Sequence, residues 1–519
     1  MEEELKTGEA DTDDAVESKA AADTEANEPI AADTEAANTP VKPNEYDTDS
    51  PAITESDVSS EEKHVNALGT DPIWKLIIKF SVPAIIGMVC NAIQNIINRI
   101  FVGQAVGAVA LGAVSVSFPI MILYIALANL FGVGATTLTA IRLGQKRNEE
   151  AEQILGVAVL IMFIIPVVLL VICFIFREPI LMAAGATETN FQYCKDYFEV
   201  IILAMLFCLP CIGINNFIRT EGSPQISMWT QILTSVVNII VNYICVMKLG
   251  WGVRGAALGI LVGNFVSLIW VMSYFVGKRS KSFLKIRRKN LRIRWNLLSK
   301  ICLLGTAPFL MQIANCVQSL IMNKTVVEYG GDTGLAIVSV VTGMSSLLVM
   351  SLVGLNQGAQ PIMGYNYGAG IYRRVKNALF MTMAFATILG TFFFILLQLF
   401  GDGLSALFMG ASKDLVPMAS HALKVYYICL PLIGAQIACT GYFQAIGKPV
   451  YSAVLSLSRQ VLIFIPCLLI LPHFFQLEGA WMSAAVADAV SCITTAILII
   501  PSIRKLNRYI AKGEIINYE

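Results

Sequence analysis

Amide side chains recur at helical spacing within three apolar segments of this 519-residue chain, and they are its first candidates for chemistry. Residues three or four apart share one face of a helix, so the amides of each segment line up. The set is Asn91, Gln94, Asn95 and Asn98 in the first apolar segment, Asn238 and Asn242 in the fifth, and Gln312, Asn315 and Gln318 in the seventh. Because an amide is costly in lipid, these side chains should face partner helices or a water-filled cleft. Both interpretations stay open for any single amide, and the continuous face of the first segment favours the cleft.

Two charged residues lie deep in the last two apolar segments. Arg459 is nine residues beyond Val450, where one segment begins, and Asp488 is nine residues beyond Gly479, where the next begins. At 1.5 Å per residue in helices of opposite direction, both lie about 13 Å from opposite faces of a hydrocarbon core about 30 Å thick. An unpaired charge there is expensive, so the two are predicted to pair or to share a hydrogen-bonded network with Gln460. The pair is either a static link between helices or, if the carboxylate titrates, an ion relay centred on Asp488.

The stretch GLNQGAQPIMGYNYGAG follows the apolar run MSSLLVMSLV, and a fainter copy, GVGATTLTAIRLGQ, begins at Gly132. Its small residues permit close contact between helix backbones. Its amides offer polar partners to the backbone or to water in a cleft; they are Asn356, Gln357 and Gln360.

The motif RTEGSP places Arg219 and Glu221 at the end of the fourth apolar segment. Glu221 is expected to pair with Arg219 or to cap the following helix. A gate formed by the two residues at this end of the segment is the alternative.

Nothing in the sequence indicates an enzyme. HExxH, P-loop and GxSxG motifs are absent, and the three histidines are too dispersed for a metal site. Twelve cysteines lie mostly in apolar runs and suggest no disulfide framework, and packing explains the one CxxC, Cys208 and Cys211. We therefore expect no catalytic residue, no metal, no cofactor and no nucleic acid partner.

Composition indicates an all-α integral membrane protein. The chain is 56% hydrophobic and 14% charged, with a mean hydropathy of +0.66, unlike a soluble protein of this length. A helix needs about 20 apolar residues to cross a bilayer. On that criterion twelve transmembrane helices are predicted, near 73–98, 107–135, 152–176, 194–217, 225–247, 254–277, 297–327, 333–360, 374–400, 416–443, 450–472 and 479–503.

Charge is segregated along the chain. The first 64 residues hold 20 acidic and four basic residues and little to bury, so 1–66 is predicted to be a disordered acidic tail. The tail either lies against basic loops or stays solvated without a partner. The bridge from Lys278 to Lys300 has ten basic residues and no acidic one, which favours the cytoplasm. An even number of helices then puts both termini on the cytoplasmic side.

The two halves of the apolar region repeat each other at an offset of 224 or 225 residues. Pro83 aligns with Pro308, Gly134 with Gly358, and RTEGSP with QAIGKP. Six helices per half give a parallel, pseudo-symmetric repeat with a cleft between two bundles that rock against each other. The predicted parts are a tail at 1–66, a first six-helix bundle at 67–277, a basic linker at 278–296, a second six-helix bundle at 297–508 and a C-terminal tail at 509–519.

From Trp74 to Arg508 the chain resembles the multidrug and toxic compound extrusion (MATE) transporters, most closely their bacterial DinF-like branch. The segments that carry the resemblance are IFVGQAVGAVALG, NNFIRTEGSPQISM, NQGAQPIMGYNYGA and SRQVLIFIP. The resemblance implies two six-helix bundles and export of organic cations and drugs driven by inward H⁺ or Na⁺. Where such transporters usually have aspartate in NIVDxIFVG and NIILD, this chain has Asn98 and Asn242. Asparagine cannot titrate, so a coupling site in the first bundle would be lost or relocated.

These observations favour a secondary active exporter of amphipathic or cationic compounds in exchange for H⁺ or Na⁺. We expect it to be a monomer in contact with membrane lipid, in the cytoplasmic (inner) membrane of a bacterium. A flippase for lipid-linked sugars is one alternative, although it should have a more cationic cleft. A non-transporting membrane sensor or scaffold, with the acidic tail as an interaction arm, is the other.

Overall fold

The computed structural model describes residues 60–106, 108–184, 191–276, 282–409 and 413–516, and all regular elements in these ranges are helices. This confirms the predicted all-α class. The predicted acidic tail lies outside the described residues except for its last part, which begins helix α3 (Ser60–Thr70) rather than being disordered. Residues 55–519 form one compact unit.

After α3, the described residues of the first half form six long helices and one short one. They are α4 (Ile73–Val106), α5 (Ala108–Gly144), α6 (Asn148–Ile175), the short α7 (Arg177–Ala183), α8 (Phe191–Thr220), α9 (Pro224–Asn242), which continues as a π-helix over Tyr243–Lys248, and α10 (Gly252–Phe275). A bridge over residues 282–294, with a single 3₁₀ turn at Arg288–Asn290, leads to the second half.

Long and broken helices build the second half. They are α11 (Trp295–Gly368), α12 (Tyr372–Met409), α13 (Val416–Tyr426), α14 (Leu430–Ala445), α15 (Pro449–Leu457) with a π-helix over Ser458–Ile463, and α16 (Phe464–Ile516), which runs past the predicted end of the last span. Non-helical backbone angles break α11 at Gly331 and α16 at Gln476. Each break is a turn between two antiparallel passes.

Twelve passes through a membrane can be traced in the described residues. Ten continuous helical segments are long and apolar enough to span a bilayer, and the bent pair α13 and α14 supplies an eleventh. One of the ten covers 63 residues, Pro449–Ala511, far more than the roughly 20 that a bilayer needs. The break at Gln476 divides it into two spans, so the count agrees with the prediction from the sequence.

The outer surface of the described helices is apolar, as expected for contact with hydrocarbon. Bulky side chains such as Phe174, Leu399, Phe474 and Ile497 are more than half exposed. Lipid chains can surround such side chains without the cost of exposing them to water. Polar side chains instead collect between helices, where the candidate site lies.

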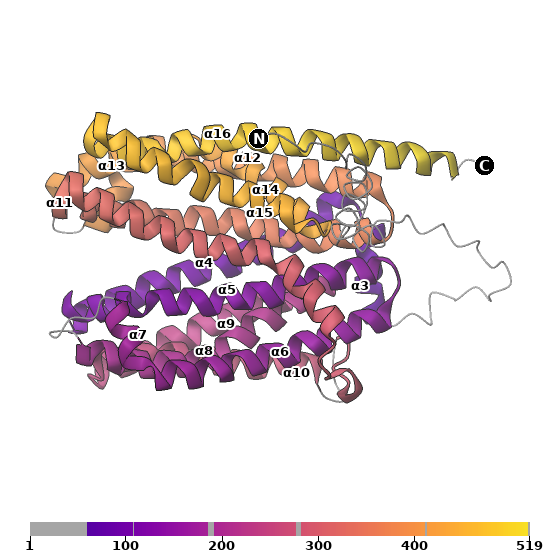
Figure 1. The fold of residues 1–519 in the computed structure, drawn as a ribbon, viewed down its shortest axis with the longest axis horizontal. Helices are drawn as coiled ribbons and strands as arrows, with labels where there is room; N and C mark the ends of the chain where they lie inside the picture. Colours follow the sequence, from indigo (N-terminus) through magenta and orange to yellow (C-terminus); the bar gives the residue numbers. More distant parts are fainter. Residues whose placement is uncertain (1–59, 107, 185–190, 277–281, 410–412, 517–519) are drawn as a thin grey trace, which may run out of the picture. The chain divides into compact units, whose positions relative to one another are not determined.

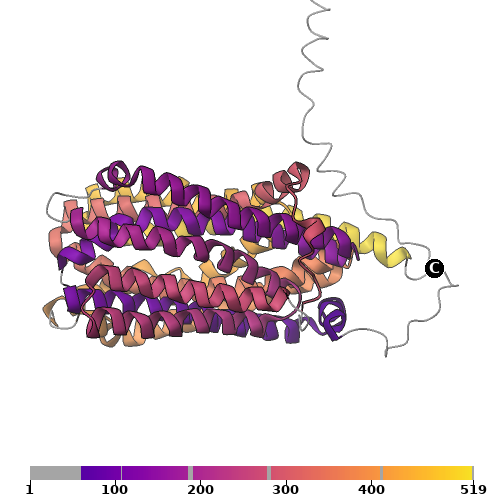
Figure 2. The ribbon, with the colours of Figure 1, turned by 90° about the horizontal axis from the view of Figure 1, so that it is seen from below.

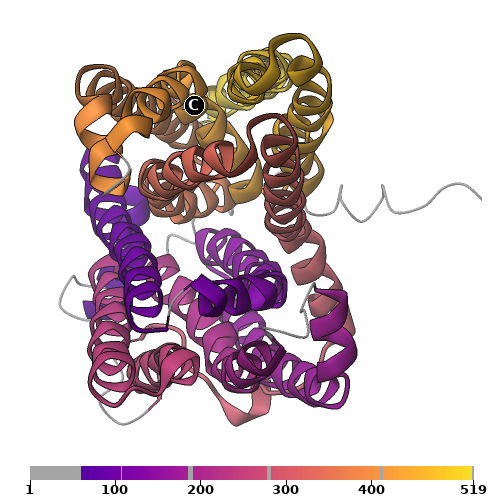
Figure 3. The ribbon, with the colours of Figure 1, turned by 90° about the vertical axis from the view of Figure 1, so that its left-hand side faces the viewer.

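The helices fall into two groups, α4–α10 and α11–α16, seen from the side in Figure 1 and end-on in Figure 3. The most extensive packing between the groups joins α11 to α4 and α5. The chain passes from one group to the other through the bridge, and we call this end of the helices the bridge end. At the same end α16 extends beyond the other helices (Figure 2).

The glycine-rich stretch was predicted to end a helix near residue 360, but α11 continues through it to Gly368. Its glycines recur four residues apart, at Gly354 and Gly358 and again at Gly364 and Gly368. Such spacing forms a flat stripe on a helix that a second helix can approach closely. The glycines therefore serve contact between helices here and do not terminate the segment.

Candidate functional site

Glycines bring the two halves into backbone contact at the bridge end. A Cβ atom built on Gly144 of α5 would lie 2.0 Å from the carbonyl oxygen of Tyr365, and one on Gly368 would lie 2.1 Å from that of Ile141. Both distances are far below any ordinary Cβ contact, so only glycine fits at either position without a shift. Each glycine packs against the helix that carries the other, and the two are equivalent in the 224-residue repeat.

A second reciprocal contact lies deeper between the halves. A Cβ on Gly134 of α5 would lie 2.1 Å from the carbonyl oxygen of Ile301, and one on Gly358 would lie 2.6 Å from Cα of Ser81 in α4. A Cβ on Gly305, in the helix that Gly134 contacts, would in turn lie 1.8 Å from the carbonyl oxygen of Leu130 in α5. The halves thus meet through two sets of contacts that exchange under the repeat, and we call this closed region the seam.

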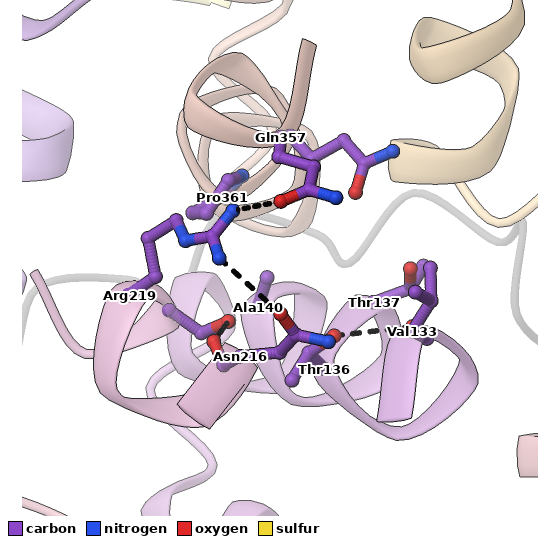
Figure 4. A pocket seen from close by; sticks show the side chains of 10 residues that line it. Val133, Thr136, Thr137, Ala140, Asn216, Arg219, Gln357 and Pro361 are labelled. Atoms are coloured by element: carbon purple, nitrogen blue, oxygen red, sulfur yellow. Dashed lines mark hydrogen bonds between the residues drawn. The ribbon is translucent and has the colours of Figure 1, made fainter. Parts of the chain in front are cut away.

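Arg219 adds a polar link across the seam, drawn in Figure 4. It is 4% exposed, and its Nη1 donates to Oε1 of Gln357 in the other half at 2.6 Å, while Nη2 donates to Oδ1 of Asn216 at 3.3 Å. A cavity of about 30 Å³ adjoins the guanidinium. Its lining comes from α5, α8 and α11 and includes the hydroxyls of Thr136, Thr137 and Thr220 and the amides of Gln357 and Gln360.

Glu221 does not pair with Arg219 and does not cap α9, so both local roles expected from the sequence are wrong. Its buried carboxylate accepts hydrogen bonds from Ser282 Oγ at 2.8 Å, from Tyr274 Oη at 3.2 Å, and from the backbone N–H groups of Phe283 and Leu284. Burial raises the pKa of Glu221 to about 8, although these hydrogen bonds oppose the shift. Glu221 therefore fastens the bridge to the first half.

Two amides of α4, Asn91 and Asn98, form hydrogen bonds to α9 within the first half. Asn242 Nδ2 donates to Oδ1 of Asn98 at 2.7 Å, so the two positions that are usually aspartates in the MATE transporters are joined directly. Asn91 Nδ2 donates to Oε1 of Gln231 at 3.3 Å, and Ser235 Oγ donates to Oδ1 of Asn91 at 3.3 Å. These bonds favour inter-helix packing over cleft lining for Asn91 and Asn98.

The remaining predicted amides divide between buried and accessible positions. Asn238 is fully buried, and neither polar atom of its side chain has a hydrogen-bond partner in the described residues. Accessible amides lie on α4, where Asn95 is exposed and Gln94 is half-buried, and on the first part of α11. The latter are half-buried and comprise Gln312, Asn315 and Gln318, with only a 3.4 Å contact between the first two.

The amides of the glycine-rich stretch lie near the seam. Gln357 accepts from Arg219, and Gln360 Nε2 donates to Oε1 of Gln444 at 2.6 Å within the second half. Asn356 packs against Gly441, and its Oδ1 has no partner in the described part of the chain. Only Gln357 of these three forms a hydrogen bond between halves among the contacts described.

Arg459 and Asp488 form an ion pair in the second half. Arg459 Nε lies 2.6 Å from Oδ1 of Asp488, and the side chain of Asp488 is 5% exposed. Arg459 lies in the π-helix over Ser458–Ile463, a local distortion that is frequent at functional sites. Gln460 does not join the pair, since its Oε1 is buried without a partner in the described residues.

A latch that the sequence did not reveal ties α3 to the second half. Arg374 of α12 donates to the carbonyl oxygens of Leu68 and Asp71 at 3.2 and 2.6 Å, and Asn366 Nδ2 donates to that of Leu68 at 2.9 Å. The C-terminal carbonyls of a helix lack intrahelical partners, so these donors satisfy them. Because α3 leads directly into the first half, the latch spans both halves at the bridge end.

The sequence analysis also missed the partners of its candidate amides. Gln231 and Ser235 extend the face of Asn238 and Asn242 at spacings of four and three, so the helical spacing used for the other amides could have found them. For Gln444 the signal was the repeat, because Gln444 aligns with Arg219 at an offset of 225.

Comparison with known proteins shows similarity along most of the chain. The chain is 27% identical over 439 residues to the multidrug export protein MepA of Staphylococcus aureus (strain MSSA476), covering 83% of this chain and 94% of MepA. It is 28% identical over 436 residues to MepA of Staphylococcus haemolyticus (strain JCSC1435), with the same coverage.

Solved structures share the fold. A crystal structure of MATE in complex with MaL6 superposes with a TM-score of 0.82 at 23% identity, covering 86% of this chain and 99% of that one. An outward-facing multidrug resistance MATE family transporter of the MOP superfamily has the same TM-score and coverage at 24% identity. Assignment to the DinF-like branch stays a prediction.

The MatE family model matches twice, at residues 83–244 and 308–469. The two matches begin and end 225 residues apart, which confirms the internal repeat found in the sequence. Together they cover more than half of the chain. The chain therefore belongs to the MatE family and is a multi-pass membrane transporter, not an enzyme.

Proposed function

We propose that this protein is a secondary active multidrug exporter that exchanges amphipathic or cationic compounds for H⁺ or Na⁺ by alternating access. The observation that carries the proposal is the seam, where equivalent glycines of the two halves close one end of the interface. Parallel repeats about an axis along the membrane normal transport by rocking one half against the other. The names of the relatives, which are multidrug export proteins, support drugs as the cargo.

The charge of the bridge indicates on which side of the membrane the seam lies. The bridge carries basic residues and lies beside the seam, and basic loops are retained in the cytoplasm. We infer that the seam is the cytoplasmic gate, that both termini are cytoplasmic, and that the protein resides in a bacterial cytoplasmic membrane as a monomer. In this structure the cytoplasmic gate is closed, and opening it must break the bond between Arg219 and Gln357.

Coupling to an ion is assigned to Asp488. The first half offers Asn98 and Asn242 at the positions where a carboxylate is usual, and an amide pair cannot exchange a proton. Asp488 is a buried carboxylate within a span, and such residues in transporters mark ion pathways. Release of Arg459 as Asp488 binds H⁺ or Na⁺ would change the packing between α15 and α16.

The accessible amides are assigned to the cargo. Gln94 and Asn95 on α4 and Gln312, Asn315 and Gln318 on α11 retain exposed surface and have few partners among the described residues. Amide oxygens can accept hydrogen bonds from cationic drugs without fixing one geometry. This suits varied amphipathic cargo.

Ethidium efflux tests the proposal. Cells expressing the protein should lose preloaded ethidium faster than cells carrying an empty vector, and an ionophore that collapses the ion gradient should remove the difference. Retention equal to that of the empty cells, at verified expression, would contradict multidrug export and favour a flippase or a sensor.

A further inference from the structure

Arg219 holds a buried positive charge that no carboxylate neutralises within the described residues. Within the described residues its guanidinium donates two hydrogen bonds, to the neutral amides of Gln357 and Asn216. A guanidinium has five N–H bonds, so three have no acceptor in the described part of the chain. Glu221 is close in sequence, but its carboxylate is turned to Ser282 and the bridge. A buried cation without a counter-charge is costly, and such a site needs an explanation.

The cavity beside Arg219 has the size and lining for a small anion. Its volume of about 30 Å³ is room for one or two water-sized groups. The hydroxyl of Thr137, the Nε2 group of Gln357 and the second N–H of Gln360 Nε2 can donate hydrogen bonds into it, whereas the hydroxyls of Thr136 and Thr220 donate to backbone carbonyls of their own helices. Thr137 and Gln357 are drawn in Figure 4. No carboxylate lines it. This volume fits a halide-sized ion and is far smaller than the pockets of several hundred Å³ that bind drugs.

Packing alone does not require the arginine. At the equivalent position of the second half, Gln444 accepts a hydrogen bond from Gln360 at 2.6 Å, and the contact carries no charge. The same fold therefore closes around a neutral amide pair in one half and around a guanidinium with an adjoining cavity in the other. The difference points to a ligand of Arg219.

We propose that the Arg219 cavity binds a halide-sized monovalent anion, chloride in the cell, which neutralises the guanidinium and stabilises the closed seam. The cavity is lined from both halves, by α5 and α8 on one side and α11 on the other. If the halves separated, the residues of α5 and α8 would move away from those of α11, and the anion would lose part of its binding site. An anion that binds only the closed arrangement shifts the population toward it. The site is independent of the drug and ion sites proposed above, and its binding can be measured without transport.

Two measurements on the purified full-length protein test the site. The melting temperature should rise saturably with chloride or bromide when ionic strength is held constant with gluconate, which is too large for the cavity. Crystals grown in bromide should show an anomalous peak between Arg219 and Thr137. A melting temperature identical in chloride and gluconate, with no bromide peak, would overturn the proposal.

Variants assign the effect to the guanidinium. Arg219→Gln, which copies the second half, should lose the chloride response. Arg142→Gln should keep it, because Arg142 is a half-buried arginine that is paired with Glu150 and does not line the cavity. Gln357→Glu places a carboxylate beside the retained guanidinium and should make the protein in gluconate as stable as the wild type in chloride. If Gln357→Glu still responds to chloride like the wild type, the anion is bound elsewhere and the proposal fails.

Discussion

Replacement of Gly144 by alanine should force the cytoplasmic seam apart. The added Cβ would lie 2.0 Å from the carbonyl oxygen of Tyr365 and 2.8 Å from the backbone nitrogen of Ala369. Both neighbours are backbone atoms of a helix, so neither can rotate away. An ordinary contact begins at 3.4 Å, so α5 and α11 must separate by roughly 1.4 Å at this point.

The energetic cost follows from close packing. Overpacking a tight contact costs about 1–3 kcal/mol. If the inward-open arrangement relieves the clash, the same free energy shifts the equilibrium between closed and open seam by roughly 5- to 150-fold. Gly368→Ala should act in the same way, because its Cβ would lie 2.1 Å from the carbonyl oxygen of Ile141.

Electron spin resonance can measure the shift. Spin labels at Asn148→Cys and Asn377→Cys, which are exposed near the ends of α6 and α12, report the distance between the halves once the native cysteines are replaced. Gly144→Ala should move the distance distribution to longer values, and Gly403→Ala, where an added Cβ meets nothing within 4 Å, should not. An unchanged distribution in folded Gly144→Ala protein would refute the argument that the seam is a closed gate.

Three further predictions concern the polar groups. Asp488→Asn should abolish gradient-driven export while protein levels persist, since an amide cannot bind and release a proton; vesicle transport at matched expression checks this, and full transport would remove the coupling role. Glu221→Gln should change the pH dependence of melting, because the folded pKa of Glu221 is about 8 against an ordinary 4.5. The wild type should be most stable at low pH and lose a few kcal/mol as the pH rises from about 4.5 to about 8, at about 1.4 kcal/mol per pKa unit, whereas the variant should not. Melting curves that depend on pH in the same way for both proteins would contradict the burial argument. Arg374→Ala removes hydrogen-bond donors to α3, so hydrogen exchange in Ser60–Thr70 should accelerate while exchange in α4 is unchanged; protection equal to the wild type would exclude the latch.

The fold could be predicted from the sequence because a membrane leaves few alternatives. Apolar length identifies spans, and every backbone group must be satisfied within a helix. The repeat also followed directly, since Pro83 and Pro308 begin the two family matches at the offset read from the residues. The ends of helices were less predictable. The glycines near residue 360 were expected to end a helix, but the helix continues through them because they make close contacts with neighbouring helices.

The candidate site was harder to predict than the fold. The spacing of residues shows which side chains share one face of a helix, but it does not show which helix packs against that face. The interval from Asn91 to Asn98 predicted one polar stripe, but only three-dimensional packing shows that it meets Gln231 and Asn242. For Arg459 and Asp488, depth along the helix was enough to predict the ion pair, because a charge within a membrane is stabilised by an opposite charge at the same depth. Glu221 was predicted to pair with its sequence neighbour Arg219, but its partners lie about 50 to 60 residues away, in α10 and in the bridge.

Transport by the purified protein in proteoliposomes is the most direct test of the central claim. When an H⁺ or Na⁺ gradient is directed toward the side of the seam, we predict that ethidium moves from that side to the opposite one, coupled to counterflow of the ion, and that both fluxes stop when the gradient is abolished. Folded protein that moves no ethidium under either gradient, or moves it equally without one, would contradict secondary active export.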